Sequence, residues 1–323
     1  MTRAGTNCYG LSLSKLILKM LAFSRRGRLL SPSSQARRGV VVRRRRAKLR
    51  PVHALSLTSW FRVPSQMERS ELLSRASCFF VPSSADGALH VVGSSHVVAP
   101  WRWRGYYPQE WVAALDASHV TLSAELRDEE RGHVLASFDV EPEVVHHASR
   151  DACVMRLAAS PSDVMREAEK HGCAAIPLTL RGKDAAPLPH GEQLYFEGFE
   201  VQENSSEDGG GGDDDEVSDE DTRALVPLRS EGRLSISSAR QAFAETATVL
   251  PLGMCGSPVM CVATGEAIGM VEGVVPPLSR EQQATASELR KRLTGSAVYV
   301  DAAAINDLVA TVEAAQSAKA ASL

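Results

Sequence analysis

Short apolar runs, and runs in which apolar and polar residues alternate, recur along the chain from residue 78 onward, and they predict β-strands. Glycine, proline, serine or charged turns separate these runs, a pattern typical of antiparallel strands joined by short connections. The predicted strands cover residues 78–81, 88–92, 120–126, 132–140, 151–157, 176–180, 193–199, 224–228, 233–236, 259–262, 267–271 and 297–300. The chain is therefore expected to be mostly β.

Helical patterns are fewer and lie between or after the strands. A helix-like connector over residues 163–171 would link two groups of strands, and a short helix is expected over residues 68–76. Residues 276–292 form a polar connection between two predicted strands, and this connection is expected to be helical from Ser279. The last strand is followed by Asp301, which is predicted to cap a helix reaching about residue 320, because a carboxylate accepts hydrogen bonds from the free N–H groups of a first helical turn.

The distribution of charge divides the chain near residue 67. Residues 1–67 carry 15 of the 36 Lys and Arg residues and no Asp or Glu, so residues 68–323 carry 21 basic and all 39 acidic residues, a net charge of −18. Such a split predicts a disordered basic leader, residues 1–67, joined to an acidic globular body. The composition of this leader favours a mitochondrial transit peptide.

Two alternatives for the leader stay open. The basic run at residues 43–50 also fits a nuclear signal or an arm that contacts RNA or an assembly partner. A chain that starts at Met67 would instead leave a body without targeting, which would be cytoplasmic.

A second segment of unusual composition lies within the body, at residues 203–221. It holds ten acidic residues, four consecutive glycines and no basic residue, so it cannot bury apolar area and is predicted to be disordered. The plainest interpretation is a solvated insertion in a surface loop. The alternatives are an electrostatic decoy that covers a basic groove and a binder of cationic peptides.

Several kinds of site find no support in the sequence. None of the six cysteines forms a Cys-x-x-Cys pair, and the adjacent His146 and His147 lack matching ligands, so neither a metal nor a cofactor is expected. No run of eighteen apolar residues predicts a membrane-spanning helix. The cluster at residues 101–107 interleaves aromatics with arginine, which favours a loop over one end of a barrel or, alternatively, a stacking surface for bases or peptides.

The most informative stretch is a small-residue loop that carries one thiol, Leu252-Gly-Met-Cys255-Gly-Ser-Pro-Val-Met260. Two glycines flank Met254 and Cys255, so the backbone can turn sharply and approach a ligand closely. The loop resembles the nucleophile loop of trypsin-like (chymotrypsin-fold) peptidases, with cysteine in place of serine. This form is similar to the chymotrypsin-like cysteine proteases of RNA viruses, whereas the hairpin that follows and the final strand and helix resemble the HtrA/Deg branch.

Two upstream elements resemble the same family. His96 follows small residues and precedes apolar ones, as the catalytic histidine does, although His90 is a competing candidate. Asp151 opens an Asp-x-Ala-x-x-x-Leu element and lies 55 residues after His96 and 104 before Cys255. The order His, Asp, nucleophile is that of chymotrypsin.

The resemblance implies an all-β fold of two six-stranded antiparallel barrels with a C-terminal helix. The first barrel would span residues 68–160, the second residues 161–300, and the helix residues 301–323. It also implies a triad of His96, Asp151 and Cys255, with the N–H groups of Gly253 and Cys255 as oxyanion donors. Val249 would form the base of the S1 pocket and Glu272, Gly273 and Val274 its wall.

Two functions follow from these elements. The first is a trypsin-like endopeptidase that cleaves protein or peptide substrates with a cysteine nucleophile. The second is a catalytically inactive scaffold of the same fold in an organellar assembly, because serine is replaced by cysteine and the second glycine after the nucleophile is replaced by Ser257.

Overall fold

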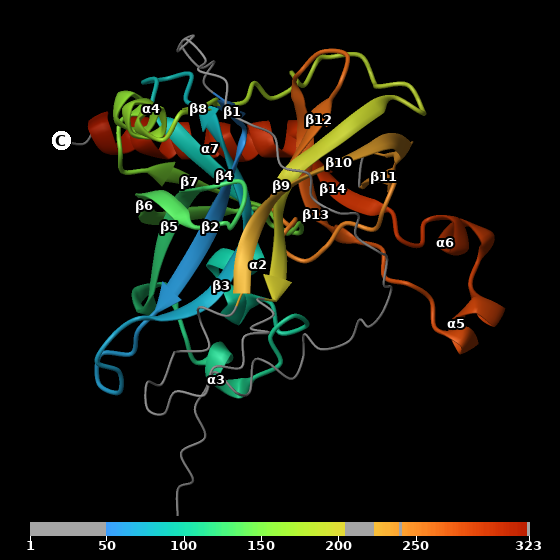
Figure 1. Ribbon diagram of the computed structural model, residues 1–323, viewed down its shortest axis with the longest axis horizontal. Helices are drawn as coiled ribbons and strands as arrows, with labels where there is room; N and C mark the ends of the chain where they lie inside the picture. Colours follow the sequence, from blue (N-terminus) through green and yellow to red (C-terminus); the bar gives the residue numbers. More distant parts are fainter. Residues whose placement is uncertain (1–49, 204–222, 239–240, 322–323) are drawn as a thin grey trace, which may run out of the picture. The chain divides into compact units, whose positions relative to one another are not determined.

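The strands close into two barrels, each with six antiparallel strands (Figure 1). The computed structural model describes residues 50–203, 223–238 and 241–321. All of them belong to one compact unit, Lys48–Gly209 together with Thr222–Leu323. The predicted fold class of two six-stranded antiparallel barrels with a C-terminal helix is confirmed. Residues 1–49 of the predicted leader and residues 204–221 of the predicted acidic insert lie outside the described residues.

The first barrel pairs its strands in the order β2-β3-β4-β7-β6-β5. Apolar side chains from alternate strand positions fill its interior, among them Leu57, Phe80 and Met155, none of which is exposed. The strands are β2 (Ala54–Phe61), β3 (Glu71–Pro82), β4 (Leu89–Gly93), β5 (Val120–Arg127), β6 (Val134–His146) and β7 (Cys153–Leu157).

The second barrel pairs its strands in the order β10-β11-β14-β13-β12-β9 and has its own apolar interior, which includes Phe196, Val259 and Ala297. Its strands are β9 (Gln193–Glu203), β10 (Arg223–Ser237), β11 (Ala242–Thr246), β12 (Pro258–Cys261), β13 (Ala267–Val274) and β14 (Ala297–Asp301).

Short helices and a small sheet complete the described chain. Between β4 and β5 lie α2 (Ser95–Val98), the 3-10 turn η1 (Pro100–Arg102), α3 (Glu110–Ala113) and the 3-10 turn η2 (Ala117–His119). After β7, α4 (Pro161–Lys170) leads to β8 (Cys173–Ala175), which pairs in parallel with β1 (Arg50–Val52). The helices α5 (Arg280–Thr285) and α6 (Glu288–Arg292) project from the second barrel, and α7 (Ala302–Ala321) follows β14 (Figure 1).

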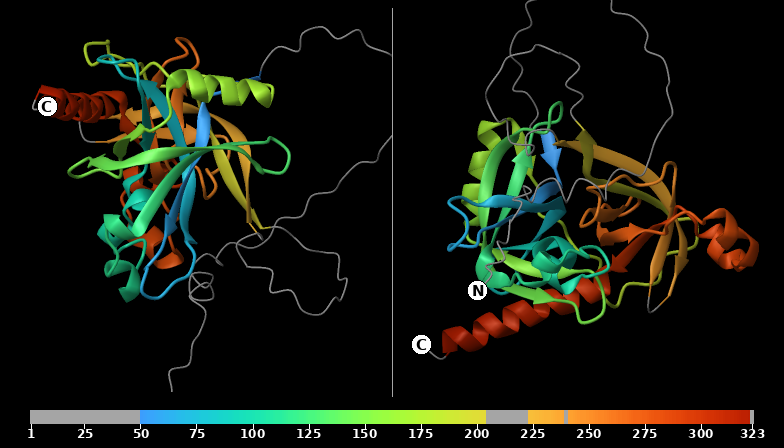
Figure 2. Two further views of the ribbon diagram at one scale, coloured as in Figure 1. Left: turned by 90° about the vertical axis from the view of Figure 1, so that its left-hand side faces the viewer. Right: turned by 90° about the horizontal axis from the view of Figure 1, so that it is seen from below.

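The helix α7 lies against strands of both barrels (Figure 2). Its Ile305 and Leu308 pack in one buried cluster with Phe79 of the first barrel and with Met260 and Met270 of the second. The predicted cap is present, because Oδ1 of Asp301 accepts the Ala304 N–H at 2.8 Å. The C-terminal helix therefore joins the two barrels.

The predicted boundary at residue 67 is wrong, because the first barrel begins at β2. Residues 55–58 alternate apolar and polar side chains, but they lie in an acid-free, arginine-containing stretch whose composition suggested a leader. A chain that started at Met67 would lack β2, which pairs with both β3 and β5. Such a chain could not close the first barrel.

Two further strand predictions differ from the structure. Residues 176–180, predicted as a strand, contribute an isolated bridge between Leu180 and Ala267 instead, because Pro177 has no N–H to donate to a ladder. Residues 224–228 and 233–236, predicted as separate strands, belong to one continuous strand, β10, which crosses Gly232 in register with β9 and β11.

Ser77 of β3 connects the first barrel to the thiol loop of the second. Its hydroxyl donates to the Gly253 carbonyl at 2.7 Å and accepts the Phe199 N–H at 3.0 Å. Its own N–H donates to the Cys255 carbonyl at 3.0 Å. The serine is fully buried, so these three bonds satisfy polar groups that water cannot reach.

We expect Gly256→Ala to destabilise the protein more than Gly265→Ala. Both glycines have positive φ, +86° and +69°, which costs another residue about 1–2 kcal/mol. A Cβ on Gly256 would also lie 1.9 Å from the Ser77 carbonyl oxygen, whereas one on Gly265 would meet no atom within 4 Å. Urea denaturation should show a loss of at least about 3 kcal/mol for Gly256→Ala. Equal losses for the two variants would contradict the close approach of the barrels.

Candidate active site

His96 and Asp151 form a buried pair at one end of the first barrel. His96 lies in α2, directly after β4, and Asp151 lies just before β7, which pairs with β4. Oδ1 of Asp151 accepts the His96 N–H at 2.9 Å, and its Oδ2 accepts the hydrogen bond of the ring Nδ1. A carboxylate can only accept, so Nδ1 carries the proton and Nε2 keeps its lone pair for use as a base.

His90, the competing candidate, is placed elsewhere. It is fully buried in β4, and neither ring nitrogen has a hydrogen-bond partner among the described residues. Its nearest acid is Glu313 of α7, at 3.8 Å from Nε2. His96 is therefore the histidine that Asp151 orients.

A second acidic side chain supports the pair from the other barrel. Oε1 of Glu272, in β13, accepts the Asp151 N–H at 3.0 Å. Oε2 of Glu272 accepts from Nη2 of Arg150 at 2.6 Å, and the same Nη2 donates to the Tyr299 carbonyl at 3.2 Å. The Glu272 carboxylate, expected on the wall of a pocket, thus serves to hold the loop that carries Asp151.

Cys255 is presented by the loop that Ser77 holds. Gly253, just before Met254, has a φ of +99°, and a Cβ there would lie 2.7 Å from the Phe199 carbonyl oxygen. Within the described residues, neither the Gly253 N–H nor the Cys255 N–H donates to an acceptor of another residue. No other described residue therefore occupies the two predicted oxyanion donors, as a site for a developing negative charge requires.

The environment of the thiol keeps it protonated. Burial, followed by the negative charge of Asp151, raises the pKa of Cys255 to about 12, and Glu272 acts in the same direction. The thiol also contacts the Glu272 carbonyl oxygen at 3.7 Å. Burial and these two carboxylates thus favour the neutral thiol of Cys255 over the thiolate.

An aromatic cover, Tyr106 with Tyr107 and Trp103, lies over His96. The Tyr106 ring stacks on the imidazole with centroids 4.8 Å apart and planes 9° apart, although Tyr106 is 54% exposed. Trp103 meets Tyr106 edge-on, and the Tyr107 hydroxyl is 3.0 Å from the Ser74 hydroxyl. The aromatic residues predicted to close one end of a barrel thus cover the histidine.

Nearby ionisable groups of the candidate site act on the Tyr106 hydroxyl. Burial raises the pKa of Tyr106 to about 12, and the charge of Asp151, then that of Cys255 once its thiol ionises, and then that of Glu272 act in the same direction. The hydroxyl of Tyr106 therefore lies near the acidic side chains of the candidate site.

The predicted S1 residues are arranged more openly than expected. Val249 is 62% exposed, so it does not form the closed base of a pocket. A Cβ on Gly273 would meet no atom within 4 Å, whereas Val274 packs against the interior of the second barrel. The structure brings together His96, Asp151 and Glu272, with Cys255 beside them, but leaves Val249 at the surface.

Comparisons with known proteins give no family for this chain. No protein-family model matches it, and no curated protein is similar to it at a significant level. The two closed barrels form a chymotrypsin-like architecture. Over the ranges that the structure describes, no helix is long and apolar enough to cross a membrane, and no three His, Cys, Asp or Glu side chains gather where they could hold a metal ion.

The pH dependence of alkylation should report the protonated thiol. Because only the thiolate reacts, iodoacetamide labelling of Cys255 is expected to rise about tenfold per pH unit from pH 7 to 10 without a plateau. Mass spectrometry of the peptide that contains Cys255 measures the rate. The urea-unfolded chain provides the control, with a plateau above the ordinary pKa of about 8.5. A plateau below pH 8 in the folded protein would instead indicate a thiolate–imidazolium pair.

The aromatic cover should discriminate between reagents by size. Replacing Tyr106 by Ala removes the stacked ring, so a bulky maleimide is expected to label Cys255 at least about tenfold faster, while iodoacetamide labelling changes little. Tyr106→Phe keeps the ring and should behave like the wild type. If Tyr106→Ala accelerated both reagents equally, the ring would be affecting thiol reactivity and not access.

Proposed function

We propose that this protein is an endopeptidase with a cysteine nucleophile on a chymotrypsin-like fold. The observation that carries the proposal is the orientation of His96, whose backbone N–H and Nδ1 are both bound by the buried Asp151. This arrangement leaves Nε2 as the one basic ring atom. Cys255 approaches from the other barrel on a loop with two unoccupied N–H donors.

The geometry supports a general-base mechanism. His96 Nε2 accepts the thiol proton while the Cys255 sulfur forms a bond to the carbonyl carbon of the scissile peptide. The Gly253 and Cys255 N–H groups stabilise the oxyanion that results. The C–N bond then breaks, the proton on His96 passes to the leaving amine, and a thioester remains on Cys255.

Water completes the reaction. His96 takes a proton from the water as its oxygen attacks the thioester carbon, and it returns that proton to the sulfur as the acid product leaves. Because burial and the charge of Asp151 raise the pKa of Cys255, the thiol proton is transferred to His96 during the attack, and the reaction depends on His96 and its partner Asp151.

One observation favours a second function, a non-catalytic scaffold of the same fold. The Tyr106 ring stacks on the imidazole of His96 and covers one face of it. If this ring never moved away from His96, no substrate could be cleaved, and the protein would act only as a scaffold.

Hydrolysis of unfolded casein and of a mixed peptide library by the full chain tests the proposal. Cys255→Ala and His96→Ala are expected to reduce cleavage about a thousandfold or more, because both groups act in the same step. Cys261→Ala is the matched control, since it removes a buried thiol on the following strand and should leave cleavage intact. Intact-mass measurement after mixing should show the thioester on Cys255.

Two results would overturn the peptidase. One is cleavage that persists in Cys255→Ala, which would trace the activity to another source. The other is the absence of cleavage and thioester in both the wild type and Tyr106→Ala, which would leave the scaffold function.

A further inference from the structure

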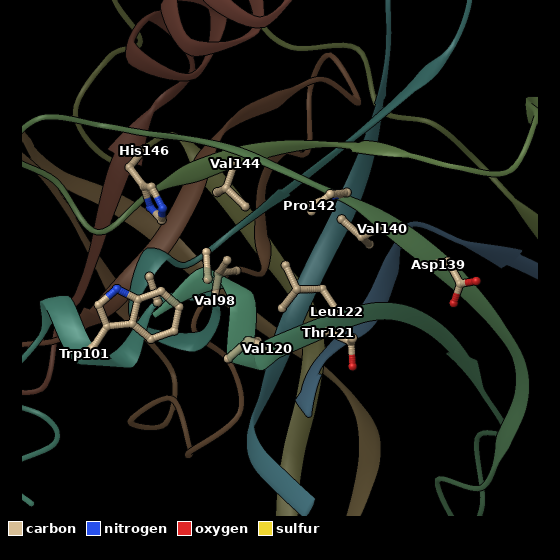
Figure 3. Close-up of a pocket in the computed structure, with 12 residues that line it drawn as sticks. Val98, Trp101, Val120, Thr121, Leu122, Asp139, Val140, Pro142, Val144 and His146 are labelled. Atoms are coloured by element: carbon tan, nitrogen blue, oxygen red, sulfur yellow. The ribbon is translucent and has the colours of Figure 1, made fainter. Parts of the chain in front are cut away.

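A cleft that is separate from the candidate active site opens in the side of the first barrel, between β5 and β6 (Figure 3). Its volume is about 470 Å³, within the range of sites that bind small molecules or peptide side chains. Val98, Leu122, Val140 and Val144 give it an apolar lining, and Trp101 closes one side. The mechanism proposed above uses none of these residues.

The cleft exists because two neighbouring strands separate. Pairing between β5 and β6 ends at Ser123 and Asp139. Beyond this point, in the part of the chain that the structure describes, β5 continues to Val120 paired with β2 alone, and β6 continues to His146 paired with β7 alone. Each strand therefore presents an edge to the space between them.

Proline explains where the strands separate. Continued in the same register, the ladder would place Pro142 opposite Val120. Proline has no N–H to donate, and it is tolerated in sheets at edges and bulges. The pairing of β6 with β7 also shifts register between Val140 and Val144, so β6 bends away at this point.

Two open strand edges around an apolar cavity match the chemistry of an extended peptide. The main chain of such a peptide can pair with a strand edge, while alternate side chains enter the cavity. The cavity is large enough for bulky aliphatic side chains and offers them valine, leucine and tryptophan as neighbours.

Charge narrows the choice of peptide. Asp139 lines the cleft, its side chain is exposed, and it forms no ion pair with another described residue. At the other end His146 is uncharged at neutral pH, because burial and the charge of Arg102 lower its pKa to about 4. The end at Asp139 therefore favours a cationic side chain.

We propose that this cleft binds an extended peptide segment of a partner protein, with a bulky aliphatic side chain in the cavity and a lysine or arginine beside Asp139. The segment pairs its main chain with the open edges of β5 and β6. Val98 lies at the end of α2, which also carries His96, so the occupant contacts the helix that holds the candidate base. The proposal does not depend on peptidase activity.

Fluorescence anisotropy with the full chain carrying Cys255→Ala tests the proposal without hydrolysis of the probe. The probe is a fluorescein-labelled peptide of sequence Thr-Val-Lys-Leu-Thr-Val-Thr, compared with a Lys-to-Gln analogue and with an analogue N-methylated at alternate peptide bonds. Saturable binding of the parent peptide is expected, with at least about tenfold weaker binding of the N-methylated analogue, because it cannot pair with a strand.

Substitutions in the cleft locate the site. Ala117→Trp and Val144→Trp fill it from the exposed rim and from within, and each should weaken binding at least about tenfold. Asp139→Asn should weaken binding of the lysine peptide about twofold to fivefold and leave that of the glutamine analogue unchanged. Ala114→Trp is the matched control, because Ala114 is exposed but does not line the cleft. Thermal unfolding of each variant confirms that it folds.

Three results would overturn the proposal. The parent peptide could fail to bind. Its binding could survive both tryptophan substitutions in the cleft, which would place it elsewhere, including near Cys255. The N-methylated analogue could bind as tightly as the parent, which would make the cleft a site for a small apolar ligand and not for a paired strand.

Discussion

The hydrogen bonds of Ser77 set the geometry on which the rest of the site depends. The candidate base and its acid belong to the first barrel, whereas the thiol belongs to the second, so their separation is decided at the interface between barrels. Ser77 binds Gly253, Cys255 and Phe199 at that interface with bonds of 2.7 to 3.0 Å. Since the serine is fully buried, the loss of any of these partners would leave a polar group without water or protein to satisfy it.

The two barrels can approach this closely because of small residues. A Cβ on Gly198 would lie 1.9 Å from the Ser257 hydroxyl and 2.7 Å from that of Ser77. Ser257, which stands where trypsin-like loops carry a second glycine, is thus accommodated by a glycine on the neighbouring strand β9. Sterics and hydrogen bonding here act on the same few atoms, and together they fix the thiol loop against the first barrel.

Electrostatics across the interface oppose a free thiolate. Asp151 and Glu272 are both buried or half-buried acids beside Cys255, and Arg150 forms its ion pair with Glu272 at 2.6 Å. Glu272 thereby has Arg150 as its ion-pair partner, and its carboxylate holds the backbone N–H of Asp151 in place. The Asp151 charge that orients the histidine therefore also disfavours the thiolate, which suits a nucleophile deprotonated only during attack.

Local patterns in the sequence predicted most strands and the order of the three candidate residues, because alternation and glycine-flanked loops are local properties. Long-range relations could not be read in the same way. The carboxylate of Glu272 points to Arg150, which is 122 positions away, and the Tyr106 ring lies on His96 only because of how the loop after η1 folds back. The strand β2 alternates only over residues 55–58, so the arginine-rich, acid-free composition of its surroundings outweighed this short pattern.

The hairpin of β9 and β10 has a consequence for the acidic segment between its strands. Glu203 and Arg223 are paired in the ladder, so the two described residues that flank the acidic segment lie at adjacent positions in the barrel. The cost of closing a loop between fixed neighbouring ends grows only by about 0.6 kcal/mol for each doubling of its length. The length and content of this segment can therefore change in evolution with little effect on barrel stability, and a reporter domain can be inserted between Glu203 and Arg223 while the register of the barrel is kept.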